Sequence, residues 1–168
     1  SAGYRDIEKQ LPVNEHSVFR LASVSKLITA TAAAKLIEDG KLDVNAPVGT
    51  LLPYLENQWA PISSRQLAAH ISGLPHYQAQ DQTLGSVRYE NSEAAVGLFK
   101  NRELLFSPGS QYRYSSWGYT LLGAMIEQQS GEPFLDYVSK NITPGMNIGA
   151  DATDSGNPDA TIAYEFAD

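Results

Sequence analysis

Apolar residues recur at helical spacing in several stretches of this chain, and each stretch ends near a glycine or a proline. This pattern predicts helices over residues 23–39, 48–52, 92–102 and 134–139, one that starts at Ser63 or Ser64, and one that runs through Tyr119 and ends at Gly131. Short extended segments are expected at residues 3–6, just before Tyr119, and at residues 161–166. The chain is therefore expected to be mainly helical.

The longest predicted helix, residues 23–39, is apolar on every side, which predicts that it is buried, and Gly40 is its expected stop. Two sets of residues are candidates for its buried side: Leu27, Ala30, Thr31, Ala34 and Ile37, or Ile28 and Leu36. Its alanines allow neighbouring elements to approach closely. That property suits a helix that must hold a reactive group rigidly.

Polar stretches predict a loop at residues 41–62 that contains the short helix at 48–52, and further loops at 78–90 and 147–159. The segment at residues 161–166 is predicted as a single strand without neighbours. Because a free apolar strand edge invites pairing with another chain, self-association through this edge is expected, and light scattering tests it.

Composition narrows the class of protein. The 168 residues, of which 42% are hydrophobic, are enough for one domain with a sizeable core. The net charge of -7 excludes nucleic acid as an expected partner, because such a chain repels phosphate backbones. The sequence contains no apolar run of membrane-spanning length and no signal peptide at Ser1. Zero cysteines exclude a disulfide framework and a thiolate metal site.

The segment Ser23-Val24-Ser25-Lys26 carries the strongest chemical signal. One helical turn separates Ser23 from Lys26, so the lysine amine reaches back to the serine hydroxyl. A serine becomes a nucleophile only beside a proton acceptor, and a lysine accepts a proton only as the neutral amine. The partial positive charge of a helix start disfavours a second cation there, and its N–H groups can stabilise an oxyanion near Ser23. Ser25 is the weaker candidate, because no lysine follows it by one turn.

The three histidines are candidates for metal binding or catalysis. None is paired at metal-ligand spacing with a carboxylate, so no metal site is predicted. His70 lies at the end of a predicted helix, where a structural hydrogen-bonding role is expected. His16 and His76 stand isolated in the sequence.

Several segments together resemble the serine β-lactamase and penicillin-binding-protein-like superfamily, in its branch of class C β-lactamases, D-alanyl-D-alanine peptidases and esterases. The matching stretches are residues 19–26, 40–43, 70–74, 108–109, 114–119 and 144–146. The resemblance implies that Ser23 is the acylated nucleophile, Lys26 its base partner, and Tyr114 the residue that passes protons to the leaving group and to water. Tyr112 and Tyr119 are the alternatives for the reactive phenol, and Tyr114 is favoured.

Two departures from the superfamily pattern bear on substrate choice and completeness. Ser116 stands where a Tyr-x-Asn element has its asparagine, and it is the expected substrate contact. The downstream Lys-Thr-Gly or His-x-Gly element is not found in this sequence. The expected fold is therefore the helical part of an α+β fold with most of its antiparallel sheet missing. Residues 1–168 are expected to form one truncated domain, with a strand remnant and lead-in at 1–22, a helical region at 23–146, and a loop and strand at 147–168.

The resemblance implies a serine hydrolase that acts through an acyl-enzyme on a β-lactam, peptide or ester carbonyl without a cofactor. The isolated chain is expected to turn over substrate poorly. A periplasmic or secreted location is also implied. The alternative is a scaffold or binding protein that keeps the penicillin-recognising fold without turnover.

Overall fold

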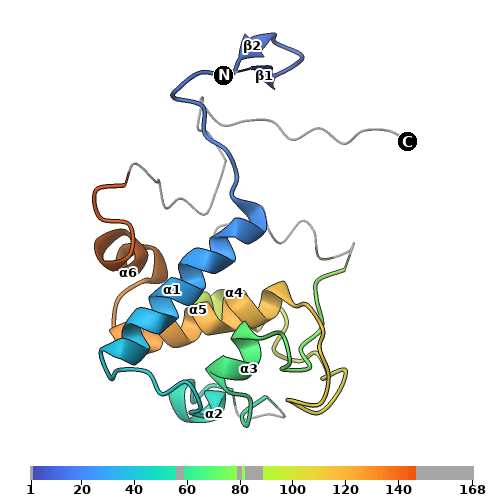
Figure 1. The fold of residues 1–168 in the computed structure, drawn as a ribbon. Coiled ribbons are helices and arrows are strands. Elements are labelled where there is room, and N and C mark those ends of the chain that lie inside the picture. The colour runs from blue at the N-terminus through green and yellow to red at the C-terminus, as the bar shows by residue number, and fades with distance from the viewer. Residues whose placement is uncertain (1, 56–58, 79–80, 82–88, 147–168) are drawn as a thin grey trace.

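The computed structural model describes residues 2–55, 59–78, 81 and 89–146. The chain opens with a hairpin of β1 (Tyr4–Asp6) and β2 (Leu11–Pro12), which pair antiparallel and lie apart from the helices (Figure 1). The other regular elements of the described residues are helices, as the sequence predicts, and irregular segments join them. The expected loop at 147–159 and strand at 161–166 lie outside the described residues, as does most of the expected loop at 78–90.

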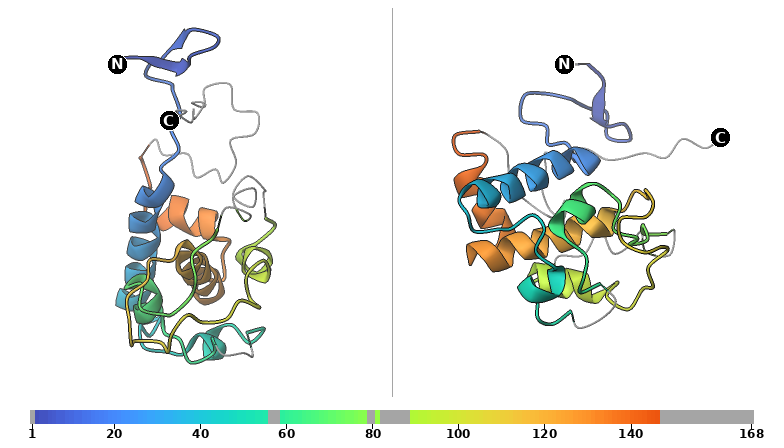
Figure 2. Two further views of the ribbon diagram at one scale, coloured as in Figure 1. Left: turned by 90° about the vertical axis from the view of Figure 1, so that its right-hand side faces the viewer. Right: turned by 60° about the horizontal axis from the view of Figure 1, so that its bottom comes forward.

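Helix α5 (Ser116–Ser130) is the centre of the helical body. It contacts α1 (Ser25–Glu38), α3 (Ser64–Ala68), α4 (Ser92–Gly97) and α6 (Phe134–Asn141), which surround it (Figure 2). The short α2 (Val48–Leu51) also reaches it. Eight of its residues are buried: Trp117, Gly118, Leu121, Leu122, Gly123, Ala124, Met125 and Ile126. Six of the 21 buried hydrophobic residues of the described chain therefore come from this one helix.

Both ends of α5 follow from local sequence. The Ser115 side chain caps the start by accepting a hydrogen bond from the Gly118 N–H at 3.1 Å, a contact worth about 1 kcal/mol. Gly131 ends the helix with a φ of 71°, in the left-handed region that favours glycine. The predicted stop at Gly131 is confirmed. Ser63, one of the two predicted caps of α3, makes a capping box with Gln66.

The prediction for the buried side of the first helix is half right. Its buried residues are Thr29, Ala32, Ala33 and Leu36, with Ile28 half-buried against the core, which agrees with the second of the two sets. The first set is wrong, because Leu27 is 70% exposed and Ile37 is 37% exposed. A helix that is apolar all round carries no sign of which side packs. Only its neighbours α5 and α6 decide that.

Helix α4 is shorter than the predicted 92–102. It ends at Gly97, and Phe99 then turns into the core, where its ring stacks on Trp117 at 4.9 Å between centroids and on Trp59 at 5.7 Å. Such aromatic pairs add about 0.5 to 1.5 kcal/mol each beyond the burial of their area. The Trp59 indole N–H also donates to the carbonyl of Arg102 at 3.1 Å. These tertiary contacts replace the last predicted turns of helix.

A ladder of backbone hydrogen bonds joins the turn after α3 to the segment before α5. Leu105 donates to Gly73 at 2.8 Å, Gly109 to Ile71 at 2.7 Å and Arg113 to His70 at 2.8 Å. Gly73 has a φ of 82°, and a Cβ there would collide with the carbonyl oxygen of Phe106, so only glycine fits. The ladder sets the position of the residues that lead into α5.

Candidate active site

Ser23 and Lys26 lie where the first helix begins. Ser23 is in a single 3-10 turn, η1 (Ala22–Val24), and Lys26 is in the first turn of α1. The Lys26 Nζ donates to the Ser23 Oγ at 3.2 Å. The Ser25 hydroxyl instead donates to the carbonyl of Ala22 at 2.6 Å. Of the two candidate nucleophiles, Ser23 is therefore the one beside the amine.

Tyr114 is brought to Ser23 from 91 residues further along the chain. Its phenol oxygen lies 2.7 Å from the Ser23 Oγ, within hydrogen-bond distance. The two alternative tyrosines are placed differently. Tyr112 is 67% exposed, and the Tyr119 hydroxyl donates to the carbonyl of Ala68 at 3.1 Å. Tyr114 is the tyrosine that the structure places against the serine.

Ser116, in the first turn of α5, completes a polar cluster with Ser23, Lys26 and Tyr114. Its hydroxyl accepts a second hydrogen bond from the Lys26 Nζ, at 3.1 Å. The Lys26 ammonium also lies 5.0 Å from the centre of the Tyr114 ring and 5.6 Å from that of Tyr119, both in cation–π range. Lys26 is thus held at the centre of the cluster, and the four residues expected at the site lie together.

The cluster changes the acidity of Tyr114. Its polar contact with the Lys26 ammonium, and second its hydrogen bond with Ser23, hold the pKa of the phenol below its ordinary value, while partial burial opposes this shift. A phenol with a lowered pKa releases its proton more readily. As the phenolate, Tyr114 can take a proton from Ser23 and return it later.

Replacing Lys26 by methionine is expected to raise the pKa of Tyr114 towards the ordinary tyrosine value of about 10, because the first cause of the shift is removed. The measurement is a pH titration of 13Cζ-labelled tyrosine by NMR, with Tyr114→Phe used to assign the signal. Ser116→Ala is the matched control, because Ser116 is the smallest of the causes, and a smaller change is expected. An unchanged titration in Lys26→Met contradicts the electrostatic account.

A pocket of about 330 Å³ lies beside the cluster, lined by His76, Tyr112, Arg113 and Tyr114. His76 stands isolated in the sequence, and its place at the site is a feature that sequence reasoning missed. Arg113 adds a cation to a chain of net charge -7. The sequence holds one sign of this placement. His76 follows His70 across the tight turn at Gly73 and Pro75, which can bring the two histidines to the same side.

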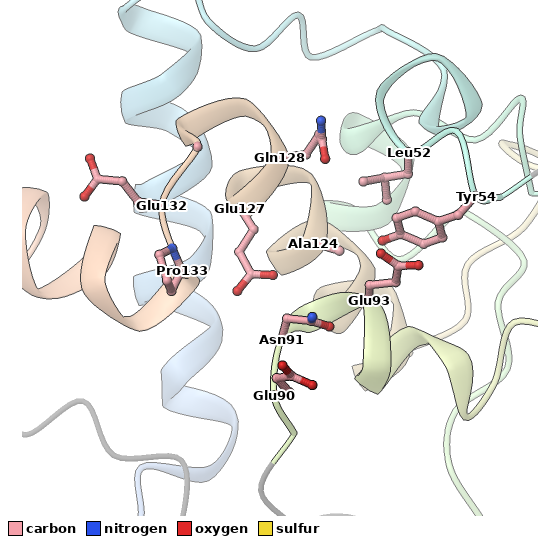
Figure 3. A pocket seen from close by; sticks show the side chains of 11 residues that line it. Leu52, Tyr54, Glu90, Asn91, Glu93, Ala124, Glu127, Gln128, Glu132 and Pro133 are labelled. Atoms are coloured by element: carbon pink, nitrogen blue, oxygen red, sulfur yellow. The ribbon is translucent and has the colours of Figure 1, made fainter.

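A second pocket, of about 390 Å³, is lined from α4, α5 and the segment that leads into α6 (Figure 3). Its acidic side chains are Glu90, Glu93, Glu127 and Glu132. Glu127 has a structural role, because its carboxylate accepts from the Ser92 N–H at 2.8 Å and from the Phe134 N–H at 3.0 Å. Burial, and then the nearby Glu93 and Glu127, raise the pKa of Tyr54 to about 12. No nucleophile beside a base lines this pocket among the described residues.

Two features are absent from the described part of the chain. No cluster of three or more His, Cys, Asp or Glu side chains suitable for a metal ion is found there. Within the same ranges, every helix is too short or too polar to cross a bilayer.

Comparison with known proteins shows the family to which the chain belongs. The family model described as Beta-lactamase matches residues 1–163. The chain belongs to the beta-lactamase family. Human "Serine beta-lactamase-like protein LACTB, mitochondrial" is 30% identical, over 82% of this chain and 38% of the human protein. "Penicillin-binding protein 4*" of Bacillus subtilis is 34% identical, over 88% of this chain and 33% of that protein.

The solved structures agree with the sequence comparison. The penicillin binding protein from Bacillus halodurans matches with a TM-score of 0.73 and 29% identity, over 85% of this chain and 44% of that one. The predicted fold class, the helical part of the β-lactamase and transpeptidase-like fold, is confirmed. The chain spans only about a third to two fifths of the length of the curated beta-lactamase-family relatives named above.

Proposed function

We propose that the protein carrying this chain is a serine hydrolase that works through an acyl-enzyme on Ser23. The observation that supports this most directly is the position of the Ser23 hydroxyl, which is 3.2 Å from the Lys26 amine and 2.7 Å from the Tyr114 phenol. A hydroxyl with two proton-transfer partners within reach is the arrangement that nucleophilic catalysis requires. Membership of the beta-lactamase family supports the same reaction class.

In the proposed reaction, the Ser23 oxygen attacks the carbonyl carbon of the substrate while its proton passes to the oxygen of Tyr114, which accepts it as the phenolate that the Lys26 ammonium stabilises. The oxyanion of the tetrahedral intermediate is stabilised by the Ser23 N–H at the start of the helix. Collapse of the intermediate breaks the bond to the leaving group, which takes the proton from Tyr114. Water then attacks the acyl-enzyme and gives its proton to Tyr114, which returns a proton to the Ser23 oxygen as the bond to the acyl group breaks and the acid product is released. No cofactor enters these steps.

The substrate class we propose is a β-lactam, a peptide or an ester that carries a negative charge near its reactive carbonyl. Two cations support this preference: Arg113 lines the pocket beside Tyr114, and Lys26 lies at the centre of the cluster. The Ser116 hydroxyl is the proposed polar contact for the substrate, as a short donor and acceptor beside Lys26.

Covalent labelling of the full-length protein tests the proposed function. A fluorescent penicillin and a neutral fluorophosphonate are each added, and the adduct is located by peptide mass mapping. The expected result is a single adduct, on Ser23, and the anionic penicillin is expected to form it. An adduct on another residue contradicts the proposal. The absence of any adduct with both probes favours the alternative, a scaffold or binding protein without turnover.

A further inference from the structure

Two imidazole rings accept hydrogen bonds from consecutive backbone N–H groups beside the site. The Nδ1 of His70 accepts from the Ser115 N–H at 3.2 Å, and the Nδ1 of His76 accepts from the Ser116 N–H at 3.1 Å. These residues directly follow Tyr114. Each histidine therefore holds one of the two peptide groups through which Tyr114 enters α5.

The same two rings also contact the side chain of Tyr114. The His70 ring lies 4.5 Å from the Tyr114 ring, tilted against it, and the His76 ring lies 5.3 Å away, edge to face. The backbone carbonyl of His70 accepts from the Arg113 N–H at 2.8 Å. Tyr114 is thus held by the two histidines through the backbone on both sides of it and through its ring.

An imidazole can accept a hydrogen bond at Nδ1 only when that nitrogen carries no proton. Protonation turns the acceptor into a donor that faces the backbone N–H, so the bond is lost and two donors oppose each other. Besides each other and Tyr114, the titratable and charged groups around the pair are Lys26, Arg113, Tyr77, Tyr112 and Tyr119. The ammonium and guanidinium among them disfavour a further positive charge.

We propose that His70 and His76 are positioning residues that hold the Tyr114 phenol against Ser23 while both imidazoles are neutral, and that their protonation releases it. This inference rests on the proposed function, because it makes acylation of Ser23 depend on the charge of two residues that do not touch the reacting atoms. The site then carries its own acid switch, separate from the titration of the catalytic groups.

The neutral form is the favoured one at neutral pH. Burial lowers the pKa of His70, and Lys26 and His76 lower it further. Burial also lowers the pKa of His76, followed by Lys26 and Arg113. Because both values lie below the ordinary value of about 6.5, the hydrogen bonds persist at pH 7 and are lost only in acid.

Two variants of His76 form the matched test, measured as the rate of Ser23 labelling in the full-length protein between pH 4 and pH 8. In His76→Asn the amide oxygen is bonded to Cγ, as Nδ1 is, so it can accept from Ser116 without titrating. In His76→Gln the same amide is displaced by one carbon and cannot. The expected result is a near-normal rate for His76→Asn at pH 7 and a fall of about 10- to 100-fold for His76→Gln.

The pH profile is the readout that a merely structural role does not move. The labelling rate of the wild type is expected to fall in acid, and the midpoint of this fall is expected below about pH 6.5. In the double variant His70→Asn/His76→Asn this acid limb is expected to shift or flatten. Asparagine suits position 70 because His70 has a φ of 59°, a left-handed conformation that asparagine tolerates. Thermal unfolding of each variant checks that the fold is retained.

The outcomes separate this inference from the proposed function. If the wild type is labelled but the double variant keeps the same acid limb, or if His76→Gln reacts as fast as His76→Asn, the inference is overturned and the serine hydrolase stands. If the wild type is not labelled, the hydrolase fails, and 15N NMR of the imidazoles decides the positioning. Unprotonated Nδ1 atoms that titrate together with the Tyr114 ring signals support it, and independent titration overturns it.

Discussion

Replacing Ser23 by alanine is expected to remove the covalent adduct completely and to lower the turnover of any substrate by at least about 10⁴-fold. The physical reason is that the attacking oxygen is lost, so neither Lys26 nor Tyr114 has a nucleophile to activate. The fold is expected to be retained, because Ser23 is exposed and its removal leaves no cavity in the core. Intact-mass measurement of the adduct and steady-state hydrolysis in the full-length protein provide the check.

Ser25→Ala is the matched control for this prediction. Ser25 lies two residues away on the same helix start, but its hydroxyl donates to the carbonyl of Ala22. Labelling of this variant is expected to remain on Ser23, with at most a modest change in rate from the lost hydrogen bond. An adduct that survives in Ser23→Ala and disappears in Ser25→Ala would reassign the nucleophile.

Tyr114→Phe is expected to lower the rate of Ser23 acylation by about 10²- to 10⁴-fold, the usual contribution of a general acid or base. The phenylalanine keeps the ring that packs between His70 and His76, so the loss comes from the missing oxygen 2.7 Å from the Ser23 Oγ. Stopped-flow or quenched labelling measures the acylation rate. The decay of the adduct measures deacylation, which is expected to slow as well.

The neighbouring Tyr112→Phe is the control, because this tyrosine is 67% exposed and lies in the same segment. Its rates are expected to stay within about twofold of the wild type, as for a surface substitution away from reacting groups. Should Tyr114→Phe also keep its acylation rate, Lys26 alone would be the proton acceptor of Ser23, and the role proposed for the phenol would be withdrawn.

Local chemistry explains which elements of the fold were predictable. The start of α3 is coded by the Ser63 cap and the end of α5 by Gly131, and both signals act within one or two turns of chain. The Ser23 and Lys26 pair is equally local, since a helix start places residues one turn apart on the same side. Contacts of this range depend on residue spacing alone, so a sequence displays them.

Contacts between distant segments cannot be predicted from residue spacing. The approach of Tyr114 to Ser23 depends on the backbone ladder from His70 to Leu105 and on the packing of α1 on α5. Residue spacing does not encode that distance, and Tyr114 was singled out through family resemblance. The shorter α4 has the same cause, because Phe99 leaves the helix to stack between two tryptophans.

By itself, the sequence determined the helical character of the chain, the stop at Gly131, and the serine and lysine one turn apart. Tertiary structure alone decided which side of α1 is buried, how close the Tyr114 phenol comes to the serine, and that His70 and His76 converge on Tyr114. The reason is the distance along the chain over which the interactions act. Helix starts and stops arise from bonds between near neighbours, whereas a site arises where separate helices pack, and that packing is set by the whole core at once.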